Sequence, residues 1–263
     1  MSSQVTPNNV VDYNFFDAIN RRYWDQRYSF DNFNTNPVTS KVGGGAATGT
    51  AGDNNAMVTR FGLFEWFVIG TQTILAPVID AFGLNLASQD ATAGDGIELC
   101  QGVTALSVAN FLVGTDAPFM MRCEFKVQDA SGCNPLIIGF RKVQAFDATL
   151  SNYTDFVSIG IVGTANPNTI KLQTQKTTAG VVTTDTTQTV ADGDTVRFAI
   201  YVSATGVVTY TINDAEPTVV AAYTFTDALN VIPFVRFTMA ADITTQASCD
   251  WYEVGFTPEP FVA

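Results

Sequence analysis

Hydrophobic and polar residues alternate over long stretches of the chain. The clearest stretch is residues 193–214, GDTVRFAIYVSATGVVTYTIND, whose first apolar set is Val196, Phe198, Ile200 and Val202. A period of two is typical of a strand that buries one face. Residues 203–206 indicate a turn, after which Val208, Tyr210 and Ile212 resume the alternation. Asn213 and Asp214 tolerate left-handed turn geometry and close the segment. The pattern therefore predicts a meander of antiparallel strands.

The same kind of segment recurs through most of the chain. Further strands are expected at 60–70, 119–127, 135–143, 155–163, 169–176, 231–239 and 249–256. Gly, Asn, Asp and Pro separate these stretches, and no helical periodicity appears among them. Short strands at such spacing predict an all-β fold, an antiparallel two-sheet β-sandwich or jelly roll over residues 59–263.

The first 58 residues have a different pattern. Val11, Phe15, Ile19 and Tyr23 recur every four residues, which predicts a short amphipathic helix over 10–28. Residues 31–55 are rich in Gly, Asn and Thr and are expected to be a flexible connector. We therefore expect an N-terminal helical arm (1–58) that either folds back on its own domain or docks on a neighbouring subunit.

The arm carries large apolar side chains that must be buried somewhere. As candidate assembly-interface residues we take Phe15, Phe16, Ile19, Tyr23, Trp24 and Tyr28. Burial of several such side chains would stabilise a contact between copies or with another protein.

Three local motifs suggest a known fold. They are the turn 192–194 (DGD) leading a long strand, the hairpin 206–213, and the closing strand 250–254 (DWYEV). In these motifs the chain resembles the concanavalin-like lectin/glucanase superfamily, a sandwich also used in bacteriophage virion surface proteins. The resemblance implies the fold and makes host glycans one candidate ligand, but it leaves the function open.

Composition excludes several classes of function. The net charge is −12 and the sequence contains no histidine. The acidic charge disfavours nucleic acid and anionic membranes as partners. The absence of histidine removes the commonest general base and the imidazole metal ligands. The four cysteines lack metal-ligand spacing and are expected to be buried free thiols, so no metal or other cofactor is expected. Neither a signal peptide nor a membrane span is expected.

The sequence also argues against glycan hydrolysis. Glucanases of the resembling superfamily share a strand with the pattern E-x-D-x-x-E, because hydrolysis needs paired carboxylates. The nearest stretch here, RCEFKVQDA, offers Glu124 but has Lys126 where the aspartate would stand. Glu124 is expected to form a cross-strand ion pair instead. We expect no enzymatic activity.

Two non-enzymatic functions remain. The first is a structural protein of a virus particle, such as a bacteriophage capsid decoration (cement) or tail-appendage protein, located in the virion and assembling as a homo-oligomer through the arm. The alternative is a carbohydrate-binding, lectin-like module. Its candidate contacts are Trp251 and Tyr201, with Asn152, Tyr153 and Asn213 as further candidates. Trp251 and Glu253 are expected to face outward from the last strand, either exposed or covered by another part of the chain.

Overall fold

A computed structural model describes residues 29–32, 39–42, 58–61, 64–70, 78–87, 92–100, 110–177, 179–240 and 246–257. These residues form seventeen strands and one short 3-10 helix, η1 (Leu150–Asn152). Sheet A contains β1 (Ser29–Asn32), β5 (Val78–Asp80), β6 (Gly83–Asn85), β9 (Phe119–Val127), β14 (Thr195–Val202), β15 (Val208–Ile212) and β17 (Ala247–Phe256). Sheet B contains β2 (Thr39–Val42), β3 (Val58–Phe61), β4 (Phe64–Ile69), β7 (Gly96–Cys100), β8 (Phe111–Leu112), β10 (Cys133–Lys142), β11 (Asp155–Ile161), β12 (Asn168–Lys176), β13 (Val182–Val190) and β16 (Asn230–Met239).

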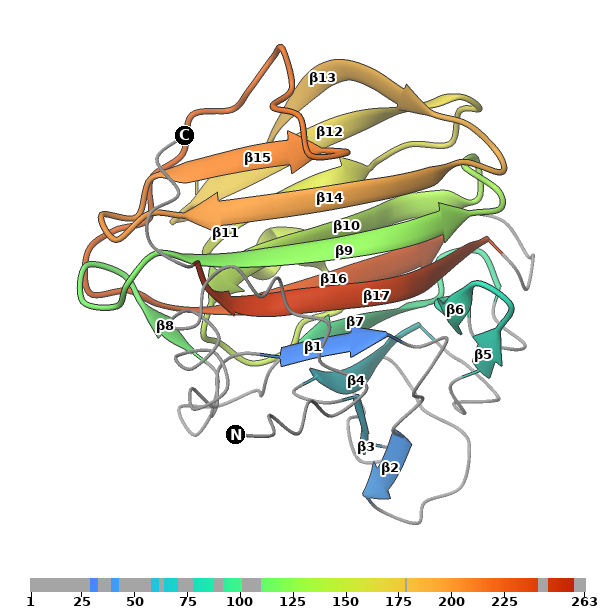
Figure 1. The fold of residues 1–263 in the computed structure, drawn as a ribbon, viewed down its shortest axis with the longest axis horizontal. Helices are drawn as coiled ribbons and strands as arrows, with labels where there is room; N and C mark the ends of the chain where they lie inside the picture. The colour runs from blue at the N-terminus through green and yellow to red at the C-terminus, as the bar shows by residue number, and fades with distance from the viewer. Residues whose placement is uncertain are drawn as a thin grey trace, which may run out of the picture.

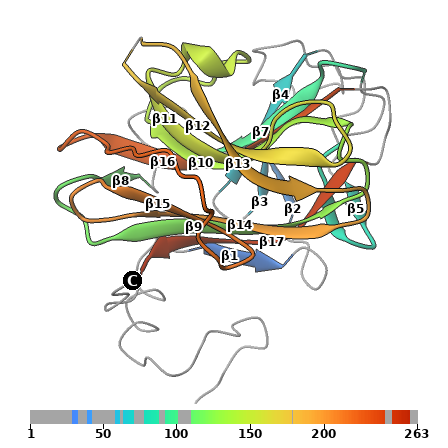
Figure 2. The same ribbon diagram turned by 90° about the horizontal axis from the view of Figure 1, so that it is seen from above.

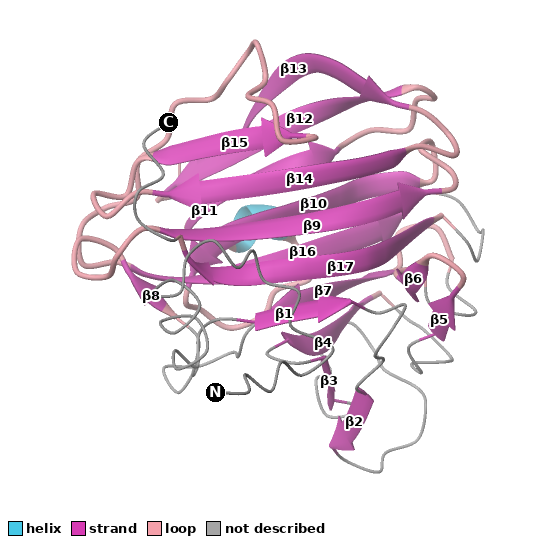
Figure 3. Ribbon diagram, viewed as in Figure 1, coloured by secondary structure: helices cyan, strands magenta, loops and turns pink. Residues whose placement is uncertain are grey.

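The two sheets stack face to face as a sandwich, which confirms the expected all-β architecture (Figures 1 and 2). The strand order is β15-β14-β9-β17-β6-β5 in sheet A, where β1 also pairs with β17. In sheet B the order is β13-β12-β11-β10-β16-β7-β4-β3-β2, with β8 beside β16. Every strand pair is antiparallel, and η1 is the sole helix among the described residues (Figure 3). No helix of the described chain is long and apolar enough to cross a membrane.

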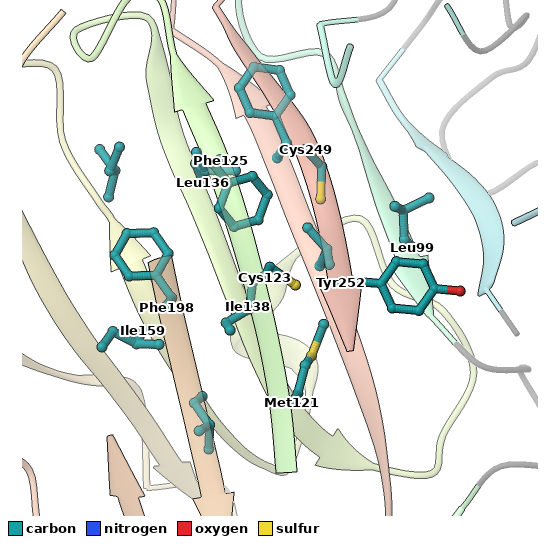
Figure 4. Packing of buried hydrophobic residues seen from close by; sticks show 14 of the residues in the cluster. Leu99, Met121, Cys123, Phe125, Leu136, Ile138, Ile159, Phe198, Cys249 and Tyr252 are labelled. Carbon is teal, nitrogen blue, oxygen red and sulfur yellow. The ribbon is translucent and has the colours of Figure 1, made fainter. Parts of the chain in front are cut away.

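The core lies between the sheets and follows the alternation of the sequence. In β9 the residues Phe119, Met121, Cys123, Phe125 and Val127 are buried against sheet B. Figure 4 shows this packing, in which Cys123 and Phe125 lie in one cluster with Leu136 and Ile138 of β10. All four cysteines are buried free thiols. The period-two pattern therefore predicted which face of these strands is apolar.

The predicted turns form where the backbone requires them. The amide of Gly206 donates to the carbonyl of Ser203 (2.9 Å), and Gly206 has a φ of 83°. Asn213 and Asp214 have φ values of 51° and 66°, in the left-handed region that these residues tolerate.

Strand β17 contains a β-bulge near its start. Cys249 pairs with Phe125 and Trp251 pairs with Glu124, so Asp250 is an extra residue. The bulge lets Cys249 and Tyr252 both face the core although they are three positions apart. It also leaves Trp251 on the outer face of sheet A, as expected.

The structure corrects two expectations near the N-terminus. Residues 31–55 were expected to be a connector throughout, but Asp31 and Asn32 end β1, which pairs with β17, and Thr39–Val42 is β2, which pairs with β3. Backbone pairing with exposed sheet edges overrides the turn propensity of these residues. The segment 60–70 is not one strand, because β3 and β4 pair with each other, Arg60 with Glu65 and Phe61 with Phe64. The helix expected over 10–28 lies outside the described residues, and the division at residue 58 stays a prediction.

Candidate functional site

The outer face of sheet A carries three rows of side chains set by strand register. The rows run from β17 across β9 to β14, and the second and third continue to β15. The first row is Trp251, Glu124 and Arg197. The second row is Glu253, Arg122, Ala199 and Thr211, and the third row is Gly255, Met120, Tyr201 and Thr209. Directly opposite residues of neighbouring strands share a face, so each row is a line of adjacent side chains. Figure 1 looks onto this sheet, with sheet B behind it.

Trp251 lies at the centre of an arginine cluster. Its side chain is half-buried, and the guanidinium carbons of Arg197 and Arg122 lie 5.2 Å and 5.9 Å from the ring centroid. Both distances are within the range of cation–π attraction. We call Trp251, Arg122, Arg197, Glu124 and Glu253 the Trp251 cluster.

Carboxylates fix the two arginines in place. Arg122 Nε donates to Glu253 Oε2 (2.8 Å), and Nη2 donates to the same oxygen. Burial alone lowers the pKa of Arg122, but the charge of Glu253 and its hydrogen bond outweigh burial and raise the pKa above its ordinary value. Arg122 thus stays charged on a face where its side chain is 33% exposed.

Arg197 is held in the same way on the next strand. Its Nη2 donates to Glu124 Oε2 (2.8 Å), and its Nη1 pairs with Asp214. The Nε atom of Arg197 is buried and has no hydrogen-bond partner in the described part of the chain. The expected cross-strand ion pair of Glu124 is confirmed, with Arg197 as the partner.

The structure brings three of the predicted glycan contacts to this one face. Tyr201 is half-buried in the third row, on β14. Asn213 is exposed, and its Oδ1 accepts a hydrogen bond from the Arg197 amide (2.9 Å). With Trp251 in the first row, these residues belong to one surface. Glu253 also faces outward as expected, although Arg122 helps to bury it.

The other two predicted contacts lie on the far side of the sandwich. Tyr153 and Asn152 belong to the loop that carries η1, which covers the outer face of sheet B (Figures 2 and 3). Tyr153 is fully buried and its hydroxyl donates to Glu98 (3.0 Å), so its prediction as a glycan contact is wrong. Asn152 is exposed but cannot converge with Trp251.

Beneath that loop lies a buried charge network that sequence analysis did not find. Glu98 accepts from Arg141 Nε (3.1 Å) and from Arg236 Nη1 (2.9 Å), and all three side chains are buried. Burial lowers the pKa of Arg141, but the charge of Glu98 outweighs it, so that pKa is raised. The arginines also donate to the carbonyls of Gln144 and Asp147, both at 3.0 Å. We call residues 143–154 the strap.

The network satisfies its own hydrogen bonds, so it indicates a structural latch rather than a ligand site. The sequence could not predict the contact between Glu98 and Arg236, because 138 residues separate them. The sequence could have identified Arg122 and Arg197 as residues of the outer face, because both occupy outward positions of predicted strands. The candidate assembly residues Phe15 to Tyr28 lie outside the described residues.

No family model matches the chain, and neither does any curated protein. Solved structures resemble it at the level of the fold. A β-glucanase of Bacillus licheniformis has 12% identity and a TM-score of 0.45, with 88% of this chain and 98% of that chain covered. The metal-free carbohydrate recognition domain of Emp46p has 6% identity, a TM-score of 0.46, and coverages of 72% and 87%. The CBM2 module of the evolved Dit of Lactobacillus casei BL23 phage J-1 has 9% identity, a TM-score of 0.44, and coverages of 86% and 93%.

Proposed function

We propose that this protein is a non-enzymatic recognition protein that binds glycans through the Trp251 cluster on the outer face of sheet A. The observation that carries the proposal is Trp251, a half-buried indole on a sheet face, flanked by two partly exposed guanidiniums. An indole offers an apolar surface to the C–H face of a sugar ring, and polar groups at its rim fix the orientation of the hydroxyls.

The geometry of the cluster supplies both kinds of contact. Arg122 donates hydrogen bonds from Nε and Nη2 to Glu253, whereas its Nη1 donates none within the described part of the chain. Arg197 Nε also has no partner there, but it is buried, so the donor that the cluster offers to a ligand is Arg122 Nη1. A donor left unpaired in a pre-formed cluster is suited to a hydroxyl-rich ligand.

Lack of catalysis is part of the proposal. Glu124 and Glu253 are the carboxylates nearest to Trp251 in the rows, and each is ion-paired with an arginine. A glycosidase needs a pair of carboxyl groups that can both reach the glycosidic bond, whereas both carboxylates here are held by guanidiniums. The cluster therefore favours binding over bond cleavage.

A glycan array with wild-type protein and Trp251→Ala tests the function. We expect wild-type binding to a defined set of glycans and a loss of roughly tenfold or more in affinity for the variant. Val182→Ala is the matched control, because Val182 is the most exposed of the large hydrophobic side chains described and belongs to β13 of sheet B. Absence of wild-type binding across the array, or equal loss in both variants, contradicts the proposal.

The setting we propose is the surface of a virus particle, as a bacteriophage capsid decoration protein or tail appendage. Its support is the sequence: an acidic chain with an aromatic N-terminal segment suited to assembly on neighbouring virion proteins. Gold-labelled antibody against the protein should decorate purified particles of the virus that encodes it. Unlabelled particles would contradict this setting without affecting the test of glycan binding.

A further inference from the structure

The two aromatic residues of the outer face lie on one diagonal with an arginine between them. Trp251 is in the first row on β17, Arg122 is in the second row on β9, and Tyr201 is in the third row on β14. Each step along this line crosses one strand and one row. We call it the Trp251–Tyr201 diagonal.

The diagonal is long compared with a single sugar ring. Its ends lie two strands apart across the sheet and four residues apart along the strands. Together these two separations give roughly 16 Å between the Cα atoms of Trp251 and Tyr201. One ring stacked on Trp251 therefore cannot also stack on Tyr201. A ligand that uses both aromatics must be a chain.

Arg122 is placed to contact the middle of such a chain. Its guanidinium lies 5.9 Å from the Trp251 ring centroid, and the Tyr201 side chain is close enough to contribute to the raised pKa of Arg122. The bond to Glu253 holds the guanidinium in this position. In the neighbouring third row, Met120 follows Arg122 along β9 and pairs with Gly255 of β17, and both residues are buried.

The charges around the diagonal favour an uncharged ligand. Arg122 and Arg197 are matched by three carboxylates, those of Glu253, Glu124 and Asp214. The cluster thus has no excess positive charge, and the whole chain has a net charge of −12. An acidic glycan would meet repulsion at long range and would have to displace existing ion pairs.

We infer that the site takes a linear, neutral oligosaccharide that lies along the diagonal, stacks on Trp251 and Tyr201 at its ends, and is hydrogen-bonded by Arg122 between them. This inference rests on the proposed glycan binding and specifies its ligand class. It assigns Tyr201 a role in recognising chain length, because only a ligand that spans the diagonal reaches it.

The test is a length series measured by isothermal titration calorimetry. Glucan, xylan, mannan and galactan oligosaccharides, from monomer to hexamer, are titrated into the full chain and into Tyr201→Ala and Trp251→Ala. Wild-type affinity should rise with length within the bound series and then level off. Tyr201→Ala should abolish that rise, costing roughly two- to tenfold for the longest members and nothing for the shortest. Trp251→Ala should weaken every length.

Three further measurements make the outcome decisive. Tyr201→Phe should retain the length dependence, because stacking needs the ring and not the hydroxyl. Thr195→Ala, on the same face but off the diagonal, should bind as the wild type does. A uronic-acid oligosaccharide series should bind more weakly than its neutral counterpart. Wild-type binding that does not depend on length, or equal effects of Tyr201→Ala on short and long ligands, overturns the inference alone. Absence of binding to every neutral series overturns the proposed function with it.

Discussion

At the scale of single residues, the most constrained side chain is Glu98. Its carboxylate forms ion pairs with two buried guanidiniums and accepts a hydrogen bond from the Tyr153 hydroxyl. A buried ion pair adds little net stability against an apolar substitute, but removal of one partner leaves uncompensated charge in a medium of low polarity. The free energy of unfolding should therefore depend steeply on this residue.

Glu98→Gln is expected to lower the free energy of unfolding by about 3–5 kcal/mol, because Arg141 and Arg236 would remain buried without a counter-charge. Urea unfolding followed by tryptophan fluorescence measures the change. The control is Glu124→Gln, which removes a partly exposed partner of Arg197 and should cost about 1 kcal/mol or less. Equal costs for the two variants would refute the latch.

Alkaline pH should destabilise the fold through its buried tyrosines. Burial raises the pKa of Tyr153, Tyr210 and Tyr223 above the ordinary value. The native state then keeps these protons at a pH where the unfolded chain has released them, so stability falls as the pH rises above about 10. Denaturant midpoints measured between pH 8 and pH 11 should stay level and then decline. Tyr210→Phe should make the decline shallower.

At the scale of elements, the strap is the loop whose conformation depends most on tertiary contacts. Arg141 and Arg236 donate to its carbonyls, and Phe146 stacks on Phe67 at 5.1 Å. Tyr153 joins the strap to the sheet, because its hydroxyl donates to Glu98 and accepts from the Asp147 amide (3.0 Å). The strap thus has a fixed structure although its sequence has no regular pattern.

Tyr153→Phe should loosen the strap without unfolding the sandwich. The variant leaves the Asp147 amide without its acceptor and Glu98 without one donor, which costs about 1–3 kcal/mol. Hydrogen exchange should accelerate at residues 144–154 and remain unchanged in β9 and β14. Uniform acceleration over the whole chain would show that Tyr153 stabilises the core rather than the strap.

At the scale of the whole molecule, the N-terminal region contributes strands to both sheets. β1 pairs with β17 of sheet A, and β2 pairs with β3 of sheet B. These strands cover edges that would otherwise expose unpaired backbone groups. The assembly role predicted for the arm (1–58) stays a prediction, and we propose that it belongs to the part before β1.

Two truncations separate stability from assembly. Removal of residues 1–28 should leave the melting temperature within a few degrees of wild type while reducing oligomer formation, because the six candidate assembly residues are lost. Removal of residues 1–58 should lower the melting temperature as well, since β1 and β2 are lost. Differential scanning calorimetry and native mass spectrometry measure the two effects. A full oligomer after removal of residues 1–28 would show that the arm is not the assembly element.

The sequence alone determined the all-β class, the strands with clear alternation, and the outward position of Trp251 and Tyr201. These follow from a period of two, which is a local property of the chain. It did not reveal β13, because this strand, VTTDTTQTV, has threonine on both faces and hence no contrast between them. It did not distinguish Tyr153 from Tyr201, since burial depends on what packs over a face.

Only the tertiary structure decided which distant residues meet. Glu253 and Arg122 are 131 positions apart, and the Trp251–Tyr201 diagonal spans three strands that are not consecutive in the chain. Strand order and register set these neighbours, and both result from the global packing of two apolar faces rather than from any short segment. Trp251 and Tyr201 could thus be predicted as outward side chains from the sequence, whereas the contribution of Arg122 and Arg197 and the arrangement along one line required the fold.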